Sequence, residues 1–328
     1  MIQLEQQSNI QHPTSKILHF AISALQPQLD VLRAEIPGVR AAEDIECLHR
    51  MRVASRRIRT RLRLFADILP KKRLFTWQQA MRRITPALGA ARDLDVQLAF
   101  LQDFLVTVSD SYARTGIAAV LHGLQLHRVA RQQEVETALT HLEESGILSD
   151  LHDFLQHNAA DDATHVATAA ERVLQPLIVK TVTAQLSELI RHEVYLAFPE
   201  RATEHHAMRI AAKHVRYTLE TFTPLFGDWI KPTLKMMRTL QDTLGDIHDS
   251  DVWDNLLSAH ALLELIQCDT VAFPQEVLPG ITLLQHNRRT FREKRFAELV
   301  EQWQQLQRTG YWYTLLCELQ HRNDEGGS

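Results

Sequence analysis

One segment of the chain carries basic side chains at the spacing of a single helix face. In His49–Phe65 the recurring cations are His49, Arg52, Arg56, Arg59 and Arg63, which we call ladder 1. On an α-helix these five side chains fall within about 80° of one another and span about 21 Å along the axis. Arginine offers a planar fork of donors that matches phosphate oxygens, and histidine adds a donor that gains charge near neutral pH. A rigid line of such groups suits an extended polyanion.

The same pattern recurs 157 residues later. His206–Phe222 matches His49–Phe65 at seven of seventeen positions and keeps four cations on the equivalent face: His206, Arg209, Lys213 and Arg216, which we call ladder 2. Each segment also has a separate apolar stripe, which we expect to face a core. Glu220 stands where ladder 1 ends in Arg63, so we expect weaker anion binding in the second half.

A basic face can also be only the solvated side of an amphipathic helix. Like charges four residues apart destabilise a helix by a few tenths of a kcal/mol per pair. His49–Phe65 contains no acid to offset this repulsion. A destabilising face that occurs twice in one chain favours a bound anion, with the solvated face as the alternative.

A second repeated block follows each ladder. Arg82–Val96 and Arg238–Val252 agree at six of fifteen positions, including a Leu-Gly pair and an Asp-x-Asp-Val ending. We predict that Gly89 and Gly245 each end a helix in the left-handed conformation.

Two aspartates close each block. Asp93 and Asp249 follow the glycines by four residues, and we predict that they cap the next helix or bridge to a ladder arginine. The alternative is a metal site, with Asp93 and Asp95 as ligands in the first block and Asp249 and Asp251 in the second. Carboxylates two residues apart diverge on a helix, however, and no third ligand is spaced nearby. We therefore expect these residues to be structural, and we expect no metal and no cofactor.

The positive charge is concentrated in one part of the chain. The 328 residues carry a formal net charge of -4, but the span 49–92 holds thirteen Lys or Arg against one acid, Asp67. That span is +12 and the remainder is -16, a division that implies an anionic ligand for one surface. A further basic cluster, Arg288–Phe296, spreads its cations around a helix, so we interpret it as a solvated face.

The elements that position these residues are predicted to be helices throughout, because apolar residues recur at intervals of three and four. The first opens at Pro13–Ser15 and ends near Pro37, and the others span 41–68, 72–88, 93–113, 117–143, 147–157, 164–197, 201–223, 230–245, 250–268, 275–308 and 311–321. The repeats divide the chain into a first bundle, 14–158, and a second bundle, 164–322, followed by a disordered tail, 323–328.

The composition limits the remaining possibilities. No run of about 18 apolar residues predicts a membrane span, and the first thirteen residues lack the pattern of a secretory signal. The three cysteines, Cys47, Cys268 and Cys317, are far apart and odd in number, which favours a reducing, cytoplasmic location over a disulfide framework.

The two repeated motifs together resemble the CHAD family, the conserved histidine α-helical domains, over roughly residues 14–322. The resemblance implies two four-helix bundles related by a pseudo-twofold, with basic helices facing a central groove or pore, and binding of inorganic polyphosphate at polyphosphate granules. It assigns the ligand-facing positions to ladders 1 and 2. It also implies four supporting cations before the Leu-Gly pairs: Arg82, Arg83, Lys235 and Arg238. His214 in place of Arg57 departs from the first repeat.

Three function classes follow from these residues. The leading one is a non-catalytic module that binds inorganic polyphosphate. A polyphosphate or triphosphate hydrolase is the second, although phosphoryl transfer normally needs a metal-holding acidic cluster that the ladders lack. A scaffold that binds RNA or phosphorylated proteins is the third. Aromatic residues are 7% of the chain and only Tyr217 interleaves with a ladder, which favours a base-free polyphosphate over RNA.

The ladders also predict how binding responds to pH. A bound polyanion favours the protonated imidazole, so His49 and His206 should take up protons on binding between pH 8 and 6. We expect lysine and arginine to stay charged over that range.

Overall fold

The structure, a computed structural model, describes residues 13–159, 163–258 and 276–325, and all regular secondary structure in these ranges is helical, as the sequence predicts. The first half contains α1 (Pro13–Ala34), α2 (Ile36–Ala41), α3 (Ile45–Leu64), α4 (Lys71–Thr107), α5 (Ser111–Glu144) and α6 (Ile147–His157). The second half contains α7 (Ala163–Arg191), η1 (His192–Ala197), α8 (Ala202–Phe226), η2 (Gly227–Ile230), α9 (Lys231–Leu256), α11 (Leu278–Arg308) and α12 (Tyr311–Glu325).

The predicted helix breaks at Gly89 and Gly245 are wrong. α4 runs unbroken through Gly89 to Thr107, and α9 runs unbroken through Gly245 to Leu256. The predicted helices 72–88 and 93–113 are therefore one helix up to Thr107, after which α5 begins at Ser111, and 230–245 is continuous with 250–268 as far as residue 256. The left-handed glycines of the described residues lie elsewhere, at Gly146, Gly227 and Gly310. A helix interior tolerates the cost of about 1 kcal/mol for a glycine when packing holds its neighbours. Here Leu88 and Leu244 are buried.

The two glycines have a different role from the predicted one. A Cβ added to Gly89 would lie 3.7 Å from Nε of Arg52, and one added to Gly245 would lie 3.8 Å from Nε of Arg209. Each glycine therefore lies against the arginine of the corresponding ladder. Because both helices continue, Asp93 and Asp249 lie within helices and cap neither.

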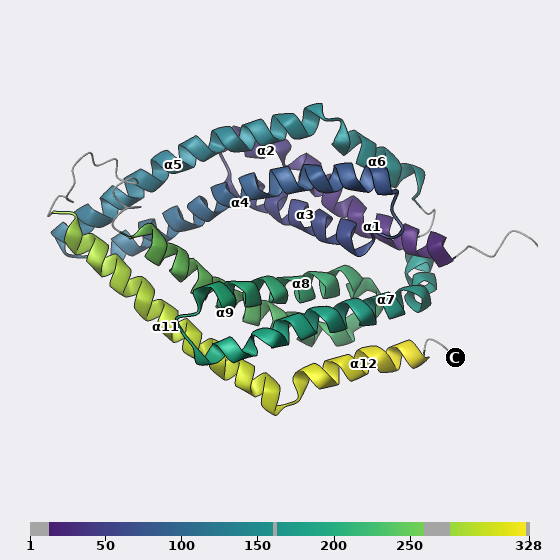
Figure 1. Cartoon of the computed structure of the whole chain (residues 1–328). Helices are drawn as coiled ribbons and strands as arrows, with labels where there is room; N and C mark the ends of the chain where they lie inside the picture. Colours follow the sequence, from purple (N-terminus) through teal and green to yellow (C-terminus); the bar gives the residue numbers. More distant parts are fainter. Residues whose placement is uncertain (1–12, 160–162, 259–275, 326–328) are drawn as a thin grey trace, which may run out of the picture.

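The helices of each half pack in the same serial order. In the first half α1 contacts α3, α3 contacts α4 and α4 contacts α5. In the second half α7 contacts α8, α8 contacts α9 and α9 contacts α11. The halves meet where α1 contacts α7, where α3 contacts α8 and where α5 contacts α11 (Figure 1). The ladder helices α3 and α8 are thereby brought together in the middle of the molecule.

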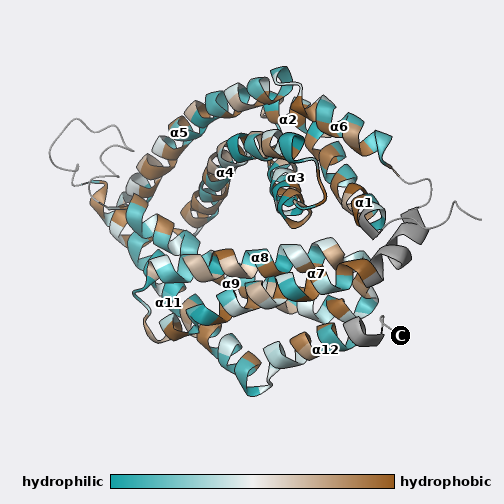
Figure 2. Ribbon diagram, turned by 45° about the vertical axis from the view of Figure 1, so that its right-hand side comes forward, coloured by the Kyte–Doolittle hydropathy of each residue, from teal (hydrophilic) through white to brown (hydrophobic). Residues whose placement is uncertain are grey.

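The apolar residues form two clusters, and both of them join the halves. The larger one runs through both halves and includes Phe20, Phe65 and Phe222, whose ring centroids lie 5.8–6.1 Å apart. The smaller one joins α4 and α5 to α9 and α11, around Ile117 and Trp253. Figure 2 shows hydrophilic and hydrophobic residues interspersed along the helices, as expected of helices that bury one stripe. No helix in the described residues is long and apolar enough to cross a membrane.

Some predictions fall partly outside the described residues. The predicted boundary between the bundles includes residues 160–162, and the predicted end of one helix at 268 and start of the next at 275 also lie outside them. α12 reaches Glu325, so residues 323–325 of the predicted tail are helical, and 326–328 lie outside the described residues.

Candidate anion-binding site

Two ladder helices, α3 and α8, position the basic residues, and their apolar stripes decide the orientation. Met51, Ile58 and Leu62 of α3 are fully buried, as are Met208 and Val215 of α8. Burying one stripe of each helix in the core turns the neighbouring ladder face away from it. The repeating apolar pattern thus determines the direction in which the basic side chains of each ladder point.

Five of these cations surround one cavity of about 430 Å³, which we call the ladder pocket. Its charged lining consists of Arg56, Arg59, Arg63, Arg82 and Lys213, with His214 beside them. No acidic residue of the described chain lines it. The pocket therefore brings ladder 1 and ladder 2 together around a space of one charge sign.

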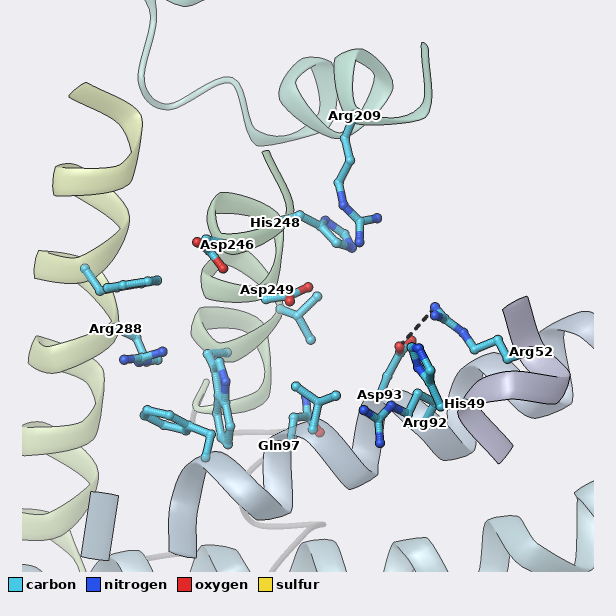
Figure 3. A pocket seen from close by; sticks show the side chains of 15 residues that line it. His49, Arg52, Arg92, Asp93, Gln97, Arg209, Asp246, His248, Asp249 and Arg288 are labelled. Carbon is cyan, nitrogen blue, oxygen red and sulfur yellow. Dashed lines mark hydrogen bonds and ion pairs between the residues drawn. The ribbon is translucent and has the colours of Figure 1, made fainter. Parts of the chain in front are cut away.

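A second cavity of about 410 Å³, which we call the mixed pocket, is lined by residues from the N-terminal parts of the ladders. His49, Arg52 and Arg209 line it, as do the acids Asp93 and Asp249 (Figure 3). Arg92, His248 and Arg288 add further basic groups. Its wall is charged in both signs and also carries aromatic rings.

The cations at the contact of α3 and α8, Arg56 and Lys213, are partly buried and have no acidic partner among the described residues. No acid lies within ion-pair distance of Arg56 among the described residues, its Nε has no hydrogen-bond partner, and its guanidinium lies 4.7 Å from the ring centre of Tyr217. Burial lowers the pKa of Arg56 to about 10. Burying an uncompensated charge costs several kcal/mol, so this arrangement is stable only where a ligand or water compensates it.

The pKa of Lys213 is lowered more strongly than that of Arg56. Burial and, after it, the positive charges of Arg209, Arg56 and Arg52 together lower the pKa of its ammonium group to about 7. Our expectation that every lysine stays charged between pH 6 and 8 is therefore wrong for Lys213. The physical reason is that a lysine loses its proton readily when it is desolvated among like charges.

The arginines of α3 outside ladder 1 are in a different situation. Arg50 pairs with Glu35 at 2.5 Å, and Arg57 lies 3.5 Å from Glu220. Arg61 donates to the carbonyl oxygen of Ala24 at 2.6 Å. These off-face arginines have partners within the fold, whereas Arg56, Arg59 and Arg63 have no acidic partner among the described residues.

The last cation of ladder 2, Arg216, has an acidic neighbour that offsets its charge. Arg216 lies 3.7 Å from Glu220 and lines neither pocket, and the same carboxylate also faces Arg57. Glu220 therefore offsets the charge of Arg216, in the place where the sequence predicts weaker binding.

The ladder histidines are held in an environment that disfavours charge. Burial and the nearby guanidinium groups of Arg92 and Arg52 lower the pKa of His49, and its Nδ1 is buried with no hydrogen-bond partner. His206 lies with its Nδ1 3.0 Å from Nδ1 of His248, so one ring donates and the other accepts. Burial lowers the pKa of His248 to about 4 and also lowers that of His206.

The two aspartates of an Asp-x-Asp pair contact different helices. Asp93 lies 3.4 Å from Arg52, which is the bridge to a ladder arginine that the sequence predicts. Asp95 pairs with Arg128 of α5 at 2.6 Å, and Asp251 pairs with Arg292 of α11 at 2.5 Å. The second aspartate of each pair thus ties the outer helix to the bundle. No group of three or more His, Cys, Asp or Glu within the described ranges is arranged to hold a metal.

Three of the four supporting cations lie away from both pockets. Arg83 contacts His141 of α5, while Lys235 and Arg238 are exposed on α9. Only Arg82 lines the ladder pocket. A position before the Leu-Gly pair is therefore not enough to place a cation at the site.

Several pocket residues were not predicted. Arg92 and His248 occupy aligned positions directly before Asp93 and Asp249, so the repeat itself could have identified them. Arg288 lines the mixed pocket, although the sequence assigns its whole cluster to a solvated face. No periodicity distinguishes Arg288 from Arg289, which pairs with Asp254 instead.

Comparisons with known proteins agree with the resemblance. A family model described as the CHAD domain matches residues 23–258. The crystal structure of the CHAD domain from the plant Ricinus communis is similar with a TM-score of 0.61 and 23% identity, covering 86% of this chain and 90% of that one. PptA from Streptomyces chartreusis is similar with a TM-score of 0.58 and 14% identity, covering 89% of this chain and 99% of that one. At these identities the structures show the fold alone. No curated protein sequence matches the chain.

Proposed function

Because the chain belongs to the CHAD domain family, we propose that it is a non-catalytic binding module for inorganic polyphosphate, held in a basic groove between its two halves. The observation that carries the proposal is the pair Arg56 and Lys213, two partly buried cations that line the same pocket. No acid of the described residues lies within ion-pair distance of either one, and burial lowers the pKa of both. An anion that enters the ladder pocket regains the energy lost by burying them.

The distribution of ladder 1 supports an elongated anion. His49 and Arg52 line the mixed pocket, while Arg56, Arg59 and Arg63 line the ladder pocket. A ligand that contacts the whole ladder must extend from one pocket into the other. Polyphosphate is linear, flexible and charged on every unit, so it can follow this path.

The ladder pocket also lacks a platform for bases. Its one aromatic ring, Tyr217, is buried and already faces the guanidinium groups of Arg56 and Arg216 at 4.7 and 5.0 Å. Proteins that bind single-stranded nucleic acid present rings on which successive bases stack. The ladder pocket is therefore better suited to a base-free chain than to RNA.

We propose further that the halves are duplicated bundles related by a pseudo-twofold. Equivalent residues make equivalent contacts in both halves: Gly89 and Gly245 lie against Arg52 and Arg209. Asp95 with Arg128 and Asp251 with Arg292 form matching ion pairs. This symmetry supports one continuous groove to which both ladders contribute.

A hydrolase is the competing function, because Asp93 and Asp249 line the mixed pocket. Magnesium is commonly held by one or two carboxylates together with substrate phosphates. Asp93 is already engaged with Arg52, and the ladder pocket offers no carboxylate. We therefore expect no phosphate release from polyphosphate in the presence of Mg²⁺, and sustained release would contradict the non-catalytic assignment.

The test of binding compares two double variants of α3 that each remove two positive charges. Arg59→Gln with Arg63→Gln removes exposed cations of the ladder pocket, and we expect affinity for long-chain polyphosphate to fall about 100-fold, since hydrogen bonds to charged groups contribute about 1.5–3 kcal/mol each. Titration calorimetry measures the affinity, and circular dichroism checks that helicity is retained.

The matched control is Arg50→Gln with Arg57→Gln, which removes cations already paired with Glu35 and Glu220. We expect this variant to keep wild-type affinity within a fewfold. Equal losses in the two double variants would show that net charge matters and that the ladder face does not.

A further inference from the structure

The mixed pocket has features that binding of a base-free chain does not use. In Figure 3, Arg288 lies across the pocket from Arg52, with Gln97 and Asp249 between them. The side near Arg52 carries the ladder cations. The side near Arg288 carries aromatic rings that no part of the proposed function needs.

These rings come from three helices. Phe100 of α4, Trp253 of α9 and Phe291 of α11 all line the pocket. The ring centres of Phe100 and Trp253 lie 5.5 Å apart at an interplanar angle of 61°. Trp253 is almost fully buried, while Phe100 and Phe291 are only half-buried. The ring of Phe100 also stacks on Phe104, with the ring centres 5.7 Å apart. Phe291, which has no ring partner among the described residues, is therefore the phenylalanine with ring surface for a ligand.

Arg288 extends this aromatic wall. Its guanidinium lies 3.8 Å from the ring centre of Phe100 and 4.9 Å from that of Phe291. It donates to Oδ1 of the adjacent Asn287, and no acid of the described chain forms an ion pair with it. A guanidinium held in place by rings is a stacking surface for a nucleobase, as aromatic rings themselves are.

Polar groups of the pocket wall suit the edge of a base. Gln97 offers both a donor and an acceptor through its amide, and Asp246 offers a carboxylate that Arg295 contacts at 2.8 Å. The cavity of about 410 Å³ falls within the range of pockets that hold small organic ligands. Rings, an amide and cations thus line one space of suitable size.

We propose that the mixed pocket binds a nucleoside triphosphate, with its base against Phe291 and Arg288 and its phosphates toward Arg52, Arg209 and His49. The phosphate end rests on the proposed function, because it uses the same ladder residues. It follows that a nucleotide and the end of a polyphosphate chain compete for these three side chains.

The test compares ATP with inorganic tripolyphosphate, which has the same number of phosphates and more charge but no base. In titrations of the full chain at fixed ionic strength without Mg²⁺, we expect ATP to bind about tenfold more tightly than tripolyphosphate, the size of effect that stacking of one base produces. Electrostatics alone predicts the opposite order.

Phe291→Ala locates the effect. We expect it to lower the affinity for ATP about tenfold and to leave the affinity for tripolyphosphate unchanged within twofold. Phe75→Ala, which removes an exposed ring elsewhere on α4, is the control and should change neither. Because tripolyphosphate binding is measured in the same variant, a general loss of folding is distinguished from the loss of a base site.

Three results would overturn the assignment. They are no preference of the wild-type chain for ATP, an equal loss of both ligands in Phe291→Ala, and binding of an adenosine decanucleotide without binding of ATP. Long-chain polyphosphate is titrated in parallel. If it binds while ATP has no advantage, only the nucleotide site fails, and if ATP is preferred while polyphosphate does not bind, the proposed function fails instead.

Discussion

The ladder pocket and the mixed pocket both take cations from α3 and α8, yet they differ in what surrounds those cations. The ladder pocket gathers Arg56, Arg59, Arg63 and Lys213 with no acid in its lining. The mixed pocket sets Arg52 and Arg209 against Asp93 and Asp249, and adds rings from three helices. Charge of one sign recognises any polyanion that fits, whereas charge combined with rings and amides selects for shape. The comparison teaches that one repeated motif can stand in two chemically different surroundings, which is why we propose a different ligand for each pocket.

The largest expected difference between the pockets is their response to salt. A polyanion that makes six to ten phosphate contacts loses about 10³–10⁵ in affinity between 50 and 200 mM salt, by analogy with DNA. We expect long-chain polyphosphate to follow this slope and ATP to lose far less, because the mixed pocket makes fewer phosphate contacts. Fluorescence or calorimetric titrations over that range measure both slopes. An affinity for polyphosphate that is indifferent to salt would rule out the ladder pocket as its site.

The next largest expected difference is the response to pH. The pKa of Lys213 is about 7 in the free protein, so the side chain is mostly neutral at pH 8, and a bound polyanion favours its charged form. Binding then takes up a proton, and affinity for polyphosphate should rise about fivefold from pH 8 to pH 7 by linkage. At pH 7 about half of the free Lys213 is charged, so this residue adds less than about twofold between pH 7 and pH 6. Tightening beyond that comes from His49 and His206, whose pKa values are lowered.

Two variants separate these contributions at fixed ionic strength. Lys213→Arg keeps the charge at every pH tested and should lose the dependence between pH 8 and 7. His49→Gln with His206→Gln should keep the dependence between pH 8 and 7 and retain, between pH 7 and 6, only the change of less than about twofold that Lys213 contributes. If both variants retain the wild-type profile, the three groups do not titrate on binding.

The smallest expected effect concerns the acids that set the pockets apart. Asp93→Asn removes an exposed carboxylate 3.4 Å from Arg52, and we expect affinity for tripolyphosphate to rise up to about fivefold, the range of an exposed ion pair. Titration calorimetry on the variant measures this change. A loss of affinity would mean that Asp93 orients Arg52 for the ligand rather than competing with it.

Asp95→Asn is the matched control two residues away. It removes the buried partner of Arg128 and should lower the melting temperature, since breaking a buried pair costs about 3–5 kcal/mol. Among molecules that remain folded, the affinity for tripolyphosphate should be unchanged.

The amino-acid sequence by itself determined the features that depend on local periodicity. The helical class, the ladders and the apolar stripes beside them follow from intervals of three and four residues, and the structure buries Met51 and Ile58 as that spacing requires. The repeat at offsets of 156 and 157 residues also predicted which positions of the halves are equivalent, including Asp95 and Asp251.

Only the tertiary structure decided the features that depend on distant neighbours. Packing carried α4 and α9 through Gly89 and Gly245, where the local signal predicted an end. Ion pairs such as Arg57 with Glu220 and Arg52 with Asp93 left Arg56, Arg59 and Arg63 as the arginines of α3 whose side chains have no ion-pair or hydrogen-bond partner among the described residues. That selection depends on residues up to 163 positions apart. Burial among like charges, which no local pattern reveals, lowered the pKa of Lys213. The rings of Phe100, Trp253 and Phe291 meet in one pocket because three helices converge there, although in the sequence they are scattered and too few to suggest a site for a base.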